Sequence, residues 1–213
     1  MKTKLNQNTN IIKIVALITM FIDHVGLILL DNNIFLRCIG RISFPLFFYS
    51  IFVGYFKTKD LKKYIIRLFI LFLISEPIYI LAFNRYDFNI CFSFIIELLF
   101  LYFIDHKHYL LYIITFTISL FYIPISSYMI FIIFLTPIFY YTKNTKFLFS
   151  ISYILFYLVF IYFGIPYIYI YSLFALPLIL FNIKTKVKIN KYFFYAFYPA
   201  HLLLLYITKL LFN

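Results

Sequence analysis

Nine apolar runs dominate this chain, and each approaches the length of about 20 residues that a helix needs to cross a bilayer. Of the 213 residues, 65% are hydrophobic and 12% are charged, which is typical of an integral membrane protein. The segments between the runs are short, so the sequence predicts a single all-α, polytopic membrane domain over residues 1–213. The tightest turns are expected at 124–127 and 164–166. The expected membrane-spanning helices are 11–30, 37–56, 64–83, 88–104, 107–123, 126–142, 147–164, 166–182 and 192–211.

The lysines between the runs predict how the protein is oriented. Cytoplasmic loops are enriched in Lys and Arg, and most of the net charge of +12 falls on alternate loops. The N-terminus is therefore expected in the cytoplasm and the C-terminus outside, in a cytoplasmic (inner) membrane whose lipid surrounds the chain. Charge in short clusters is not a nucleic-acid surface, so no nucleic acid is expected as a partner. The lysines on the expected cytoplasmic side are Lys2, Lys4, Lys57, Lys59, Lys62, Lys63, Lys107, Lys143, Lys146, Lys184, Lys186, Lys188 and Lys191.

The first run contains three ionisable side chains, Lys13, Asp23 and His24. Each costs roughly 2.5 to 3.5 kcal/mol in hydrocarbon, so this helix is expected to line the protein interior or a wet cavity. Lys13 and His24 are separated by eleven positions, which places them within about 20° of one direction and about 16 Å apart along a helix. Asp23 points about 100° away from His24 and is expected to serve a different partner.

Five titratable residues of four expected helices lie about 9 to 15 Å below the outer end of the bundle. A neutral histidine in such a group can act as a general base. The sequence contains no motif typical of a metal site, so no metal is expected. The five residues are Asp23, His24, Glu76, Glu97 and His201.

Structural interpretations remain open for several of these residues taken singly. A histidine can simply bond a neighbouring helix, Glu76 can support a kink at Pro77, and Lys13 can snorkel to the surface. Their common depth favours a shared site. Arg41 lies about one turn below the outer end and is expected to pair with Asp23 or Glu76, because a buried arginine needs a carboxylate.

The two cysteines, Cys38 and Cys91, both fall near the expected outer side. A disulfide between them is conceivable, but two separate buried thiols are the expectation.

Several motifs together resemble the TraX family of membrane acetyltransferases, whose named member acetylates the N-terminal amine of a conjugative pilin. They are IIKIVALITMFIDH at 11–24, GRISFPLF at 40–47, Arg67-Leu68 with Ser75-Glu76, Asn89 in FNICF, and FFYAFYPAHL at 193–202. The region 107–182 matches in hydropathy only, and Ser126-Ser127-Tyr128 replaces a Tyr-Gly signature associated with the family.

The family is similar in turn to membrane acyltransferases that place a basic residue ten positions before a catalytic histidine, a spacing that Lys13 and His24 reproduce. By this resemblance His24 is the catalytic base, and Lys13, with Arg41 and Arg67, binds the acyl-CoA donor. The resemblance also implies that Asp23 or Glu76, with Arg41, orients the histidine or the acceptor, and that His201 closes the site.

These observations predict an enzyme that moves an acetyl group from cytoplasmic acetyl-CoA to an amine at the cell envelope, such as a peptide or pilin-like N-terminus. One alternative is O-acetylation of an envelope glycan or lipid. The other is a small transporter or immunity-type membrane protein, in which the buried charges relay protons or bind a solute.

Overall fold

The computed structural model of the chain describes residues 5–6, 8–121, 128–183 and 190–212. Over these residues the protein is entirely helical, and the prediction of nine helical spans is confirmed, with the second and eighth spans each broken into two helices. The expected turn at 124–127 and the lysines at 184, 186 and 188 lie outside the described residues. The helices are α1 (Thr9–Ile28), α2 (Ile34–Gly40), α3 (Ser43–Lys57), α4 (Leu61–Phe83), α5 (Ile90–Asp105), α6 (Tyr109–Phe121), α7 (Met129–Thr142), α8 (Lys146–Tyr162), η1 (Tyr167–Ala175), α9 (Leu176–Leu180) and α10 (Lys191–Phe212).

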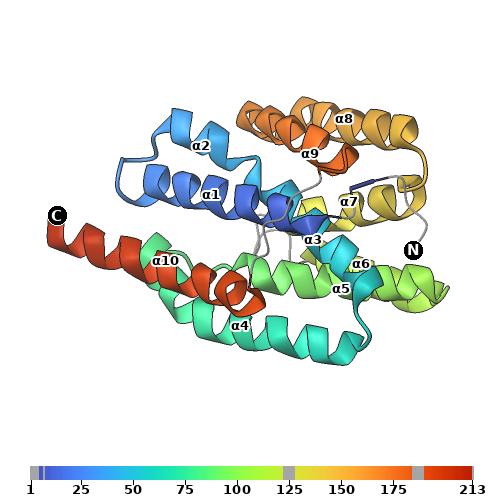
Figure 1. Cartoon of the computed structure of the whole chain (residues 1–213), viewed down its shortest axis with the longest axis horizontal. Coiled ribbons are helices and arrows are strands. Elements are labelled where there is room, and N and C mark those ends of the chain that lie inside the picture. The colour runs from blue at the N-terminus through green and yellow to red at the C-terminus, as the bar shows by residue number, and fades with distance from the viewer. Residues whose placement is uncertain (1–4, 7, 122–127, 184–189, 213) are drawn as a thin grey trace.

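Within the described residues, four helical units are long and apolar enough to cross a membrane. Shorter apolar helices accompany them, which supports a multi-pass membrane protein. The start of α1 and the end of α10 lie towards opposite ends of the long axis (Figure 1). The four long units are Thr9–Ile28, Ile34–Lys57, Leu61–Phe83 and Tyr192–Phe212.

Helix α1 packs against α2, α3 and α10, while α4 packs against both α10 and α5 (Figure 1). Asp60 caps the start of α4 by accepting a hydrogen bond from the Lys63 amide at 2.9 Å, which lowers the pKa of the Asp60 carboxyl. The hairpin after α8 turns at Gly164, whose φ of +96° is one that side chains rarely tolerate. A densely aromatic core fills the bundle, including Phe48, Phe52, Phe100, Phe139 and Phe149.

The second span breaks after Gly40 because of Pro45. Proline has no amide hydrogen, and its ring clashes with the carbonyl four residues earlier, which here belongs to Arg41. That carbonyl instead accepts a hydrogen bond from the Ser172 hydroxyl of η1, at 3.0 Å. Ser172 is held in turn by Tyr153, whose hydroxyl donates to the Ser172 carbonyl at 2.8 Å. The break therefore fixes Arg41 against η1.

Two glycines allow α1 and α2 to approach closely. A Cβ atom on Gly26 would lie 2.7 Å from the Leu36 Cβ, and one on Gly40 would lie 2.0 Å from the Asp23 carboxylate. Gly40 thus leaves the space that the Asp23 side chain occupies. The two cysteines are buried and free, as expected.

Candidate active site

One face of α1 lines three cavities in succession. Lys13, Leu17, Met20 and His24 follow a helical spacing of four, three and four residues, which keeps them on one stripe. His24 and Met20 line the first cavity, Met20 and Leu17 the second, and Lys13 the third. The shared face predicted for Lys13 and His24 is therefore confirmed.

The histidine cavity lies at the end of the bundle where α1 ends and α2 begins, and its volume is about 110 Å³. Its polar wall consists of Asp23, His24, Arg37, Arg41 and Arg85. The rest of the lining is largely aromatic and includes Phe44, Phe47, Tyr79, Phe83, Phe94, Tyr128, Tyr169 and Tyr198.

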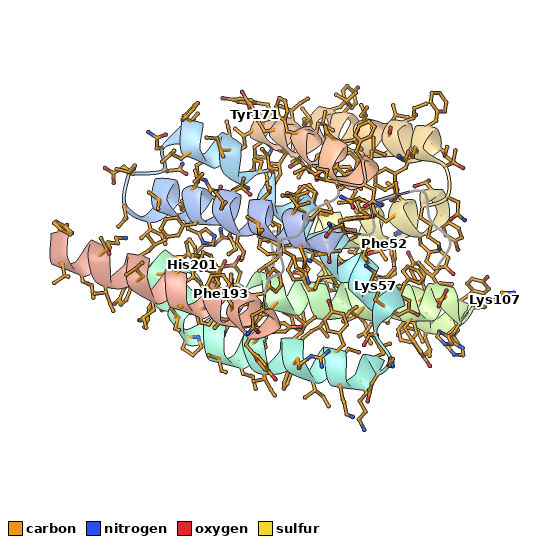
Figure 2. The ribbon with its side chains drawn as sticks, viewed as in Figure 1. Phe52, Lys57, Lys107, Tyr171, Phe193 and His201 are labelled. Atoms are coloured by element: carbon orange, nitrogen blue, oxygen red, sulfur yellow. The ribbon has the colours of Figure 1, made fainter. Side chains whose placement is uncertain are left out.

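The second cavity, the apolar passage, shares lining residues with both of its neighbours. Met20 and Tyr198 also line the histidine cavity, and Tyr195 also lines the third, the lysine cavity. The three cavities therefore adjoin one another along the bundle. In Figure 2, His201, the partner of His24 on α10, lies towards one end of the molecule, and Lys57, at the end of α3, lies towards the other.

The lysine cavity carries three cations, Lys13, Lys57 and Arg67. The Lys13 ammonium lies 5.0 Å from the centre of the Phe194 ring, and the Arg67 guanidinium lies 5.6 Å from that of Tyr64. Such cation–π contacts hold long side chains in place without cancelling their charge. The cavity therefore keeps a positive character that suits phosphate groups.

His24 is hydrogen-bonded to His201, with 2.8 Å between the His24 Nδ1 and the His201 Nε2. The two ring planes differ by 5° and their centres are 5.1 Å apart, so the rings meet edge to edge through these nitrogens. His201 is buried and stacks on Phe197, and the Phe83 ring meets His24 edge-on. Aromatic rings therefore pack against both members of the pair.

A backbone carbonyl determines the tautomers of this pair. The His201 Nδ1 lies 2.7 Å from the carbonyl oxygen of Phe197, which can only accept, so this nitrogen carries a proton. In a neutral His201 the Nε2 then has a lone pair and accepts a hydrogen bond from the His24 Nδ1. The His24 Nε2 is consequently the unprotonated nitrogen, the form that a general base requires.

Asp23 forms salt bridges with two arginines rather than with His24. Its Oδ2 lies 2.6 Å from the Arg37 Nη1 and its Oδ1 lies 2.6 Å from the Arg41 Nη2. The Arg41 guanidinium also stacks on the Tyr169 ring, 5.0 Å from its centre. The expected pairing of Arg41 with a buried carboxylate is confirmed, and the carboxylate is Asp23.

Glu76 and Glu97 were expected at the same depth as the histidines, but among the described residues neither is hydrogen-bonded to them. The Glu76 carboxylate accepts a hydrogen bond from the backbone N–H of Asn89, which caps the start of α5, at 3.0 Å. Both Glu97 carboxylate oxygens are buried and have no hydrogen-bond partner in the described part of the chain. Depth alone therefore did not identify the members of the site.

The expected roles need three changes. Asp23 and Glu76 bond other groups than His24, and the side chain that is hydrogen-bonded to His24 is His201. Arg41 lines the histidine cavity and not the lysine cavity, because its bond to Asp23 holds it at that end of the bundle.

Sequence reasoning also missed two cations. Lys57 was counted only as a topology signal, although it lines the lysine cavity. Arg37 was not among the expected site residues, although it bonds Asp23. Arg37 lies four residues before Arg41 and therefore on the same helix face, and this spacing could have indicated that the two arginines share a partner.

The site residues give no basis for a metal centre. Within the described residues, no group of three or more His, Cys, Asp or Glu side chains is arranged to hold a metal ion. The chemistry available at the histidine cavity is proton transfer by an imidazole beside fixed positive charge.

Comparison with known proteins supports a relation over nearly the whole chain. A family model described as "TraX protein" matches residues 8–209. The chain is also similar to the "Probable fimbrial assembly protein FimC, serogroup H1" of Dichelobacter nodosus, with 32% identity over 82 residues. That alignment covers 36% of this chain and only 34% of the relative, so the chain spans about a third of it. No solved structure matches this chain.

Proposed function

Because this chain belongs to the TraX family, we propose that it is a membrane-embedded acetyltransferase that moves an acetyl group from cytoplasmic acetyl-CoA to an amine at the cell envelope. The observation that supports this most strongly is the hydrogen-bonded series from the Phe197 carbonyl through His201 to His24. It leaves the His24 Nε2 unprotonated at a residue that lines a cavity. The acceptor we propose is a peptide or pilin-like N-terminus, in keeping with the fimbrial relative.

In this proposal, acetyl-CoA extends through the three adjoining cavities. Lys13, Lys57 and Arg67 would bind the phosphates of CoA in the lysine cavity, which we assign to the cytoplasmic side. The apolar passage, between Leu17 and Tyr198, would surround the pantetheine arm. The distance from Lys13 to His24, about 16 Å along α1, suits a donor with its nucleotide at one end and its thioester at the other.

The chemical step follows from the tautomer of His24. The acceptor nitrogen attacks the thioester carbonyl carbon while His24 Nε2 removes a proton from that nitrogen. A C–N bond forms, the C–S bond breaks, and the imidazolium returns the proton to the departing CoA sulfur. General-base assistance of this kind contributes about 10² to 10⁴ in rate.

His201 and the salt-bridged arginines support this step without reacting. As the positive charge forms on His24, the His201 Nε2 lone pair stabilises it by accepting the hydrogen bond from the His24 Nδ1, much as the acid does in a hydrolase triad. Asp23 and Arg41 also fix the end of α1 against α2, and so hold His24 at the cavity. Glu76 is assigned a structural role, because its carboxylate bonds the backbone at the start of α5 and not a histidine.

The test is acetyl transfer by the purified protein in liposomes supplied with acetyl-CoA and short peptides that have free N-termini. We expect release of CoA thiol and a peptide that is heavier by one acetyl group, compared with protein-free liposomes. Treatment with hydroxylamine cleaves an ester but spares an amide, so it separates O-acetylation from N-acetylation. Absence of any acetylated product from folded protein contradicts the proposal.

A further inference from the structure

The histidine cavity carries more positive than negative charge. Arg37, Arg41 and Arg85 line it, and Asp23 is the single acid among its described lining residues. Asp23 bonds both Arg37 and Arg41, so it balances one of their two charges. The remaining positive charge has to be met by solvent or by a bound group.

Arg37 is better placed than Arg41 to meet such a group. Its side chain is 17% exposed, compared with 5% for Arg41, and its bond to Asp23 uses only Nη1. A guanidinium presents five N–H donors in a planar fork, so further donors remain on Arg37 for a carboxylate or a phosphate.

Arg85 contributes a second fork from the loop after α4. It lines the same cavity and is bonded to Asp87 at 2.8 Å, while the Tyr79 hydroxyl donates to the other Asp87 oxygen at 3.1 Å. Asp87 thereby holds the Arg85 guanidinium in position at the cavity. Both arginines line the cavity that His24 also lines.

The charge of the cavity restricts the acceptor. Positive charge favours the neutral, nucleophilic form of an amine over the ammonium form. It also favours a molecule that brings its own anionic group, because an arginine fork binds carboxylate and phosphate in two-point geometry. An acceptor with an amine at one point and an anion at another satisfies both requirements.

We infer, building on the proposed function, that the acceptor is a peptide whose amino-terminal region carries an acidic side chain. Its N-terminal amine lies at the His24 Nε2, and its carboxylate lies against Arg37 and Arg85. The arginines then select the acceptor, and His24 acts on it.

The test compares two amidated tripeptides, Ala-Asp-Ala and Ala-Asn-Ala, that differ only in the charge of one side chain. The purified protein in liposomes should acetylate the Asp peptide with a kcat/KM about tenfold or more above that of the Asn peptide, the range for a hydrogen bond to a charged group. In Arg37→Gln or Arg85→Gln the ratio should fall towards one. A ratio measured within one variant is unaffected by how much of that variant is folded.

Lys209→Gln is the matched control, because it removes a positive charge near the end of α10 from a residue outside the cavity lining. It should keep the wild-type ratio. Equal rates with both peptides, or a preference that survives in both arginine variants, overturn the inference while leaving the acetyltransferase proposal intact. So does acetylation of glycerol 3-phosphate in preference to glycerol with neither peptide modified, which would indicate an anionic lipid or glycan instead.

A binding measurement separates the two proposals if no acetyl transfer occurs. The thermal unfolding midpoint of the detergent-solubilised protein should rise more with the Asp peptide than with the Asn peptide, and Arg37→Gln should abolish the difference. That result without transfer contradicts the proposed function and supports the anion site. Equal shifts overturn the inference itself.

Discussion

Replacing Asp23 with Ala should destabilise the protein more than replacing either of the arginines that it binds. Asp23 and Arg41 are 4% and 5% exposed, so loss of Asp23 leaves Arg41 as a buried, uncompensated charge. Breaking a buried pair in this way costs about 3 to 5 kcal/mol. Arg41→Ala should cost less, roughly 1.5 to 3 kcal/mol, because Asp23 keeps its bond to Arg37.

Arg37→Ala should have the smallest effect of the three, because Arg37 is the more exposed partner and Asp23 keeps Arg41. The double variant Asp23→Ala, Arg41→Ala should be less destabilised than the sum of its single changes, since removing both partners leaves no unpaired buried charge.

The free energy of unfolding can be measured by titrating the purified protein with SDS in mixed micelles and following helicity by circular dichroism. Asp31→Asn is the control, because Asp31 is an exposed acid in the turn after α1. Asp23→Ala that unfolds like this control would refute the reasoning. So would a larger loss for Arg37→Ala than for Arg41→Ala.

Three further outcomes follow from the same geometry. Gly40→Ala should displace Asp23 and lower stability, because the new Cβ would meet the carboxylate, and a normal unfolding midpoint would contradict this. Lys13→Gln should raise the KM for acetyl-CoA and change kcat less, and an unchanged KM would favour a merely snorkelling lysine. His201→Gln, which can still accept from His24 Nδ1 through its amide oxygen, should retain a higher kcat than His201→Leu with a similar KM. Equal losses of kcat would argue against the tautomer role.

Hydropathy and charge predicted the helical spans well, because the cost of placing polar backbone in hydrocarbon leaves few alternatives. The shared face of Lys13 and His24 on α1 could also be predicted from the sequence. Their separation of eleven positions fixes both their direction and their spacing on a helix. What failed was the choice of partners. Depth along a helix is one coordinate, and it grouped Glu97 with His201, although no hydrogen bond joins Glu97 to the histidine pair among the described residues.

The breaks in the helices were harder to anticipate than the helices themselves. Pro45 ends α2 and frees the Arg41 carbonyl for Ser172, a contact between residues 131 positions apart. The eighth span begins as the 3₁₀ helix η1 rather than an α-helix. Both features position Arg41, and both depend on tertiary contacts that local sequence patterns do not contain.

The most direct test of the account is the rate of acetyl transfer by purified, folded His24→Gln protein in liposomes. Glutamine keeps a hydrogen-bonding group of similar size but has no basic nitrogen, so the rate should fall by about 10² to 10⁴ while the protein still inserts and unfolds normally. His108→Gln, a change at an exposed histidine between α5 and α6, should retain the wild-type rate. Near-normal turnover by His24→Gln would show that His24 is a helix contact and not the base.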